Sequence, residues 1–161
     1  MVVLARIDDR LIHGQVVEGW VNYLKATWVI VADDAVARNP VQRSIMEIAV
    51  PEGLRVFIGT VEEVCGKLRT PALAKERIIL LFSRPRDVVR YLEAAEACAV
   101  VNIGGMRFVP GKRKVLDVLA VDDADLDALR EILRRRTRVE VQTVPTEKPK
   151  PLEKLLEGMS S

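Results

Sequence analysis

Short apolar runs rich in β-branched residues alternate along the chain with stretches in which apolar residues recur at helical spacing. The short runs are almost continuously apolar, which is typical of strands in a sheet that is covered on both faces. The predicted strands are Val2–Ile7, Thr27–Ala32, Leu54–Gly59, Arg77–Phe82, Ala97–Ile103 and, as a last alternating strand, Val139–Val144.

The intervening stretches carry helix start signals and apolar stripes. Asn39 followed by Pro40 is typical of an N-cap and a first helical residue, and Pro85 and the pair Asp122-Asp123 mark two further starts. The predicted helices are Pro40 to about Val50, Arg86–Ala97, Ala124–Arg136, and a short closing helix on Leu152, Leu155 and Leu156. A helix after the first strand should bury one stripe, formed by Val16, Val17, Trp20, Val21 and Leu24.

The repetition of strand, helix and strand predicts an α/β fold with one open, mostly parallel sheet and helices on both faces. Val115–Val121 also looks extended, but the segment before it, Gly104–Lys114, has no helical pattern. A strand reached without a helical crossover is often antiparallel, so one antiparallel strand is expected near the C-terminal edge. With no internal repeats, residues 1–161 are predicted to form a single domain.

The composition excludes several classes of function. The 161 residues carry 25 Lys and Arg against 23 Asp and Glu, a net charge of +2 that argues against nucleic-acid binding. One histidine and two widely separated cysteines form neither a metal motif nor a disulfide framework. Charge at Arg6 argues against a signal peptide, and the longest apolar run, Ile78–Phe82, is too short to cross a bilayer. We therefore expect a cytoplasmic chain that associates with the inner membrane only through a partner.

The most informative segment is the loop after the first strand, residues 8–14, because it holds the only histidine of the chain, His13. In open parallel sheets, ligands bind beyond the carboxyl ends of the strands. A neutral imidazole in such a loop can act as a nucleophile toward phosphorus. The following helix offers backbone N–H groups to an anion, and nearby arginines offer charge-assisted hydrogen bonds. The loop thus holds the groups that phosphoryl transfer needs, without a metal motif.

Other interpretations of these residues are structural or belong to another class. A lone histidine in a loop is more often incidental than catalytic, the run Asp8-Asp9-Arg10 can form an ion-paired turn, and Gly104-Gly105 is typical of a turn. A receiver domain of two-component signalling also has an acidic pair after its first strand. We reject that class, because the third strand ends in Gly59-Thr60 without a phosphorylatable aspartate and the fifth ends in Asn102 where a lysine is needed.

The run RIDDRLIHGQV, residues 6–16, followed by Trp20, resembles the signature of a known family. This family is the enzyme IIB component of the mannose/fructose/sorbose family of the bacterial phosphoenolpyruvate-dependent sugar phosphotransferase system. The resemblance covers nearly the whole chain in order, continuing through residues 31–37, Arg43, and residues 80–88, 101–106 and 139–141. A match of this length around the sole histidine is highly specific.

The resemblance implies a mostly parallel sheet of about seven strands and a role as a phosphocarrier. Such a protein accepts a phosphoryl group from a phosphohistidine of a IIA component and passes it to a sugar bound by membrane IIC and IID components. His13 would be the acceptor, through Nδ1, and Arg10 would stabilise the transferring group. No metal or cofactor is implied beyond the transient phosphohistidine. The supporting residues, which bind the phosphoryl group or hold the loop, are Arg6, Asp8, Asp9, Gly14, Gln15, Val16 and Asp33.

Two points stay open at this level. Lys114 departs from the family, in which glutamine is common at that position, and the resulting basic segment from Gly111 to Val115 bears on which permease is recognised. An alternative function is a regulatory phosphoprotein with the same acceptor histidine and no cognate permease; neighbouring genes for IIC and IID components would distinguish the two. Whether the chain forms a homo-oligomer is also left open.

Overall fold

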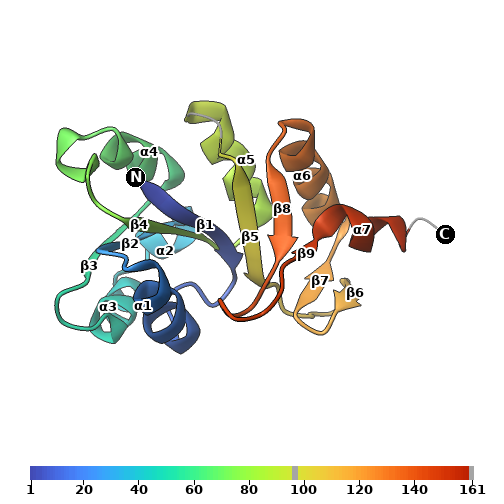
Figure 1. Cartoon of the computed structure of the whole chain (residues 1–161), viewed down its shortest axis with the longest axis horizontal. Coiled ribbons are helices and arrows are strands. Elements are labelled where there is room, and N and C mark those ends of the chain that lie inside the picture. The colour runs from blue at the N-terminus through green and yellow to red at the C-terminus, as the bar shows by residue number, and fades with distance from the viewer. Residues whose placement is uncertain (96–97, 160–161) are drawn as a thin grey trace.

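The computed structural model describes residues 1–95 and 98–159 and shows one central sheet with helices on both of its faces (Figure 1). Every neighbouring pair of strands in this sheet is parallel except β8 and β9. In spatial order the strands are β3 (Arg55–Gly59), β2 (Trp28–Ala32), β4 (Ile78–Phe82), β1 (Val2–Asp8), β5 (Val100–Gly105), β8 (Arg138–Val141) and β9 (Lys150–Pro151). The predicted open, mostly parallel α/β sheet is confirmed.

Strand β4 shows why the apolar runs form this sheet. All of its residues are buried, and they alternate between two hydrophobic clusters: Ile79 and Leu81 pack in one, Ile78 and Leu80 in the other. Since successive side chains of a strand point to opposite faces, the sheet has a core on each side. A strand buried on both faces requires a continuous apolar run, which is the pattern of the sequence.

Helices cover both cores. The helices that contribute to the cluster with Ile79 and Leu81 are the π-helical segment η1 (Gln15–Trp20), α1 (Val21–Leu24), α2 (Asp34–Ala37) and α3 (Pro40–Ala49). Those that contribute to the other cluster are α4 (Val61–Leu68), the 3-10 turn η2 (Pro71–Leu73), α5 (Pro85–Ala94), α6 (Asp123–Arg134) and α7 (Leu152–Glu157). The start signals act as predicted: Asn39 Oδ1 accepts a hydrogen bond from the Gln42 N–H at 3.1 Å, and Asp122 forms a capping box with Asp125.

Two local predictions were wrong. Val115–Val121 is not one strand: β6 (Arg113–Leu116) and β7 (Leu119–Val121) form a separate antiparallel hairpin, since the chain turns between them. The antiparallel edge strand of the main sheet is β9 instead. Gly104 and Gly105 do not form a turn but are the last residues of β5.

Around residue 97, the predicted ends of the helix and of the strand differ from those in the structure. The helix predicted over Arg86–Ala97 begins at Pro85 and ends at Ala94. Residue 97, which was predicted to end that helix and to begin the next strand, lies outside the described residues, and β5 begins at Val100. Helix α4 was not among the predicted helices, although Thr60 caps it through a hydrogen bond from the Glu63 N–H at 3.1 Å.

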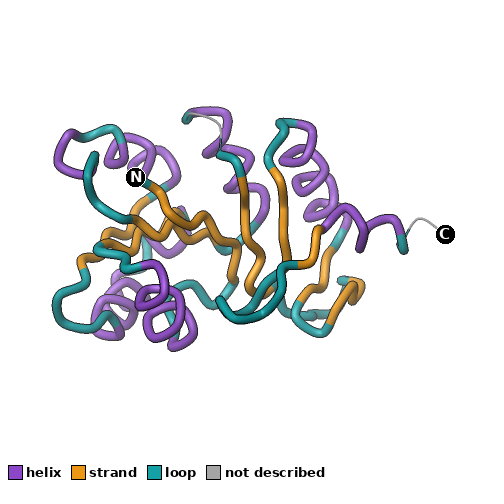
Figure 2. Tube along the Cα trace, viewed as in Figure 1, coloured by secondary structure: helices purple, strands orange, loops and turns teal. Residues whose placement is uncertain are grey.

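The topology places one loop in a crevice. From β1 the chain continues toward β2 on one side of the sheet, whereas from β5 it continues toward β8 on the other, so the switch point lies between β1 and β5. The loops that follow β1, β5 and β8 gather at the same edge of the sheet (Figure 2). Ligands of open α/β sheets bind at such a point. Among the helices of residues 1–95 and 98–159, none is both long enough and apolar enough to cross a bilayer.

Candidate functional site

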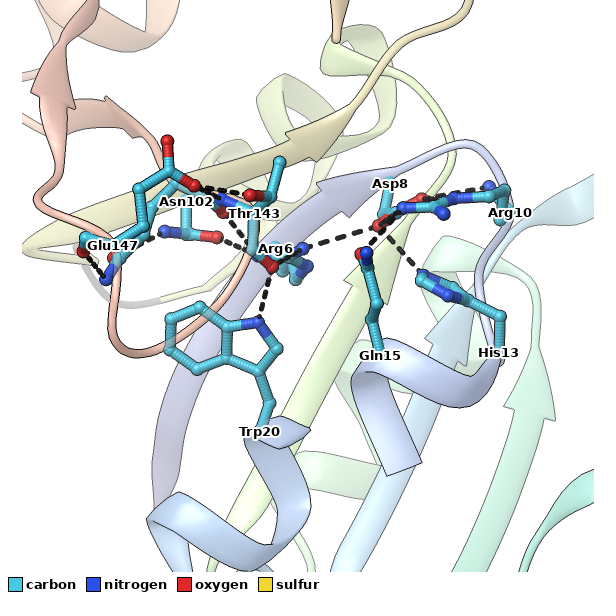
Figure 3. Close-up of polar contacts among 10 residues, drawn as sticks. Arg6, Asp8, Arg10, His13, Gln15, Trp20, Asn102, Thr143 and Glu147 are labelled. Atoms are coloured by element: carbon cyan, nitrogen blue, oxygen red, sulfur yellow. Dashed lines mark hydrogen bonds and ion pairs between the residues drawn. The ribbon is translucent and has the colours of Figure 1, made fainter. Parts of the chain in front are cut away.

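The loop after β1 is folded back on the end of its own strand. The Asp9 N–H donates to the Gly105 carbonyl at 3.0 Å, which ties the loop to β5, and the Leu11 N–H donates to the Asp8 carbonyl at 2.9 Å. Leu11 has a φ of 56°, a left-handed conformation that is unfavourable for a branched side chain. Its side chain is buried, so packing offsets this strain. The turn directs His13 back toward Asp8 (Figure 3).

His13 has one ring nitrogen bonded and one free. Its Nε2 lies 3.0 Å from Asp8 Oδ2, and 17% of its side-chain surface is exposed. Within residues 1–95 and 98–159, its Nδ1 has no hydrogen-bond partner. An ionised carboxylate can only accept, so the proton of a neutral ring is on Nε2 and the lone pair is on Nδ1. The ring is therefore oriented for attack through Nδ1.

Asp8 is the centre of the site and is fully buried. Its Oδ1 accepts from the Arg10 backbone N–H at 3.1 Å and from Arg10 Nε at 3.2 Å. Burial by itself would raise the pKa of the Asp8 carboxyl, but hydrogen bonds from His13 and Arg10 outweigh burial and lower the pKa to about 2. Asp8 is thus a carboxylate at neutral pH and can hold a positive ring.

Arg10 lies at the exposed side of Asp8. Its side chain is 40% exposed, and its Nη2 donates to Asp8 Oδ2 at 3.2 Å and to Gln15 Oε1 at 3.1 Å (Figure 3). The cation is therefore next to the acceptor ring and reachable from solvent, where it can bind an incoming anion.

Arg6 lies on the other side of Asp8, inside the protein. Its side chain is fully buried, and its Nη2 is 3.5 Å from Asp8 Oδ2. Nη1 donates to the Asn102 side chain and, at 2.8 Å, to the Gln142 carbonyl, and Nη2 donates to the Thr143 carbonyl at 2.9 Å. Burial lowers the pKa of Arg6 to about 10, although Asp8 acts in the opposite direction. Arg6 stays charged at neutral pH but is placed to support Asp8 rather than to meet a phosphoryl group.

At the start of the helix after His13, fewer backbone N–H groups are open to an anion than the sequence predicted. The N–H groups of Val16 and Val17 both donate to the His13 carbonyl, at 3.0 and 3.1 Å, and the Val16 side chain is buried. The peptide N–H groups of Gly14 and Gln15 make no hydrogen bond in the described part of the chain. The backbone donors open to an anion at His13 are thus the N–H groups of Gly14 and Gln15, because the Val16 N–H already donates within the first turn of the helix.

Asp9 and Asp33 hold neighbouring segments. Asp9 Oδ2 accepts from the Arg107 backbone N–H at 2.8 Å, which joins the loop to the segment after β5. Asp33 is the N-cap of α2: its Oδ1 accepts from the Val36 N–H at 2.9 Å, and Ser83 donates to its other oxygen. No hydrogen bond or ion pair joins Asp33 to His13 among the described residues.

Several residues of the site had no predicted role. Trp20 Nε1 donates to the Thr143 carbonyl at 3.1 Å, and its ring centroid is 5.1 Å from the Arg6 guanidinium carbon. Asn102 has one visible signal in the sequence, since it is a polar residue inside an otherwise apolar strand. Thr143 has none, because it contributes a backbone carbonyl. Among the described residues, no group of three or more His, Cys, Asp or Glu side chains is arranged to hold a metal ion.

Comparison with known proteins gives consistent matches over nearly the whole chain. The family model "PTS system sorbose subfamily IIB component" matches residues 2–160. The N-acetylgalactosamine-specific phosphotransferase enzyme IIB component 2 of Escherichia coli (strain K12) is 36% identical over 155 residues, which are 96% of this chain and 98% of that protein. The mannose-specific EIIAB component of the same organism is 36% identical over 147 residues, which are 91% of this chain and 46% of that protein. The chain thus spans about half the length of that relative.

A solved structure agrees with these sequence matches. The crystal structure of the IIBSor domain of the sorbose permease from Klebsiella pneumoniae superposes with a TM-score of 0.93 at 30% identity, over 98% of this chain and 97% of that one. Fold, loop motif and relatives define the class: the chain is a IIB component of the sugar phosphotransferase system. Within that class, the chain belongs to the sorbose subfamily of IIB components.

Proposed function

We propose that His13 accepts a phosphoryl group on Nδ1 from the phosphohistidine of a IIA component and passes it to a sugar bound by membrane IIC and IID components. The observation that carries this proposal is the hydrogen bond between His13 Nε2 and Asp8 Oδ2, because it leaves the Nδ1 lone pair free. The names of the relatives, which refer to mannose, N-acetylgalactosamine and sorbose, support a sugar as the final acceptor.

In the first step, the Nδ1 lone pair of His13 forms a bond to phosphorus while the bond from phosphorus to the donor imidazole breaks. The electron pair of that bond returns to the donor nitrogen. The His13 ring then carries a positive charge, with Nε2–H still bonded to Asp8, and the ionised carboxylate stabilises this charge. In the second step, a sugar hydroxyl oxygen attacks the phosphorus, the bond to Nδ1 breaks, and the hydroxyl proton passes to solvent.

Arg10 and the helix start neutralise the phosphoryl oxygens in both steps. Because the Arg10 side chain is part exposed, it can turn from Gln15 toward the phosphoryl group and keep its charge solvated. The free N–H groups of Gly14 and Gln15 add donors at the positive end of the helix. The protein needs no cofactor in this scheme, only the transient phosphohistidine.

The reaction requires two partners in turn at the same histidine. We place the chain in the cytoplasm, at the inner membrane, where it docks first to the IIA component and then to the permease components. Each interface must be released within a turnover, so each is expected to be modest in area.

The experiment is phosphoryl labelling of the purified chain with labelled phosphoenolpyruvate and the upstream carriers of the system. We expect one acid-labile, base-stable phosphate per chain in the wild type and none in a His13→Gln variant whose melting temperature shows that it is folded. Addition of membranes that contain the cognate permease and its sugar should discharge the label. Equal labelling of the wild type and His13→Gln would refute the proposal.

A further inference from the structure

Gly104 lies against the Arg6 guanidinium with no room for a side chain. A Cβ atom built on Gly104 would lie 2.5 Å from Arg6 Nε and closer still to Cζ and Nη2. The φ of Gly104 is outside the left-handed region, so the backbone conformation does not require glycine. Space for Arg6 is the remaining physical reason for a glycine at this position.

The guanidinium has no freedom to move away from such a side chain. It is held by the Gln142 and Thr143 carbonyls and by the Asn102 side chain, and the Trp20 ring covers it. Its Nε has no hydrogen-bond partner among the described residues. The contacts at the Nη atoms thus determine where this cation lies, and a displacement would break several of them together.

The position of Arg6 matters because Asp8 is buried between two arginines and the His13 ring. Arg10 and His13 approach its carboxylate from the solvent side, and Arg6 Nη2 approaches from the interior at 3.5 Å. A buried carboxylate orients toward its charged partners, since an unpaired buried charge is strongly unfavourable. Without Arg6 behind it, the carboxylate would be held only from the solvent side, mainly by Arg10, and Asp8 Oδ2 would be fixed less firmly toward His13 Nε2.

We propose that Gly104 is a positioning residue for the phosphoacceptor: by leaving space for Arg6, it fixes Asp8 and thereby the ring of His13. This inference rests on the proposed function of His13. In this proposal, Gly104 at the end of β5 affects phosphoryl transfer without contacting the phosphoryl group.

The first test compares Gly104→Ala with Gly66→Ala, a matched control on α4 whose added Cβ would meet no atom within 4 Å. We expect Gly104→Ala to slow labelling of His13 by about tenfold or more, because two contacting residues then compete for one space. Gly66→Ala should label at the wild-type rate. Labelling of Gly104→Ala at the wild-type rate would overturn the inference.

The second test observes the tautomer of the His13 ring directly and requires no phosphoryl donor. His13 is the only histidine, so the imidazole ¹⁵N resonances of a labelled sample report its tautomer without ambiguity. We expect the wild type and Gly66→Ala to carry the proton on Nε2, and Gly104→Ala to show a mixture of tautomers. An unchanged tautomer in folded Gly104→Ala would overturn the inference. A wild type that shows the Nε2–H tautomer but takes no label would instead refute the proposed function.

A double-mutant cycle separates the Arg6 contact from a general loss of stability. Alanine at position 6 lacks the Nε, Cζ and Nη2 atoms that the new Cβ would meet, so Gly104→Ala should cost little further rate when it is added to Arg6→Ala. Fully additive losses would overturn the inference. If Gly104→Ala does not fold, Arg6→Ala alone carries the test: mixed tautomers support the proposal, and a wild-type tautomer with wild-type labelling overturns it.

Discussion

The carboxylate of Asp8 holds the imidazole of His13 by a hydrogen bond of 3.0 Å to Nε2. The two residues are five positions apart along the chain and meet because the loop between them reverses at Leu11. This contact decides which ring nitrogen is the nucleophile, so most of the chemistry expected of the site depends on one buried carboxylate.

An Asp8→Asn substitution should therefore slow transfer as well as destabilise the fold at neutral pH. The amide can donate as well as accept, so it neither fixes the Nε2–H tautomer nor stabilises a positive ring. We expect phosphorylation of His13 to slow by roughly 10²-fold or more. Rapid-quench labelling measures the rate, and ¹⁵N resonances of the ring show the tautomer; a variant with wild-type values of both would contradict this role of Asp8.

The depressed pKa of Asp8 also predicts a dependence of stability on acid. A carboxyl whose folded pKa is about 2, against 3.8 in the unfolded chain, stabilises the fold above about pH 4 and loses this contribution as the pH falls toward 2. The full contribution is roughly 2 kcal/mol. Urea denaturation at several pH values measures it. Asp8→Asn should unfold with a shallower acid dependence than the wild type, and identical slopes would argue against the shift.

Arg10→Ala should separate catalysis from stability. Loss of the charge-assisted bonds to the transferring group is expected to slow labelling by roughly 10²- to 10³-fold, or about 2–4 kcal/mol. The melting temperature should change little, because the side chain is 40% exposed. Arg134→Ala, which removes an exposed arginine paired with Glu131 on α6, is the matched control and should label normally. A large loss of stability in Arg10→Ala would show instead that Arg10 has a structural role.

Asp33→Ala tests whether this residue supports the fold or the reaction. Because Asp33 caps α2 and accepts from Ser83, we expect a loss of roughly 1–2 kcal/mol in the free energy of unfolding, with a near-normal labelling rate. Asn39→Ala, which removes the cap of α3, provides the comparison. A much slower rate in Asp33→Ala than in Asn39→Ala would place Asp33 in the phosphoryl-binding site.

The alternation of apolar runs with helical periods was sufficient to predict the α/β sheet, because a strand buried on both faces has to be apolar throughout, as β4 is. The same pattern could not show that Val115–Val121 is divided between two strands of a hairpin, since both halves are extended and apolar. It also gave no sign that the helix after His13 begins as a π-helix, because the apolar stripe is similar for either winding.

The sequence by itself determined the family, the parallel sheet and the loop that carries the acceptor, because these depend on local patterns and on a continuous motif around His13. The tertiary structure decided which arginine faces solvent and which is buried: Arg6 and Arg10 lie in the same motif, yet only packing against Asn102 and the Thr143 carbonyl, 96 and 137 residues away from Arg6, places Arg6 inside. Contacts of this kind join segments remote in the chain, and one of them is made by a backbone atom that every residue has. The close approach of Gly104 to Arg6 belongs to the same class. It follows from the space between two strands, which a linear sequence does not display.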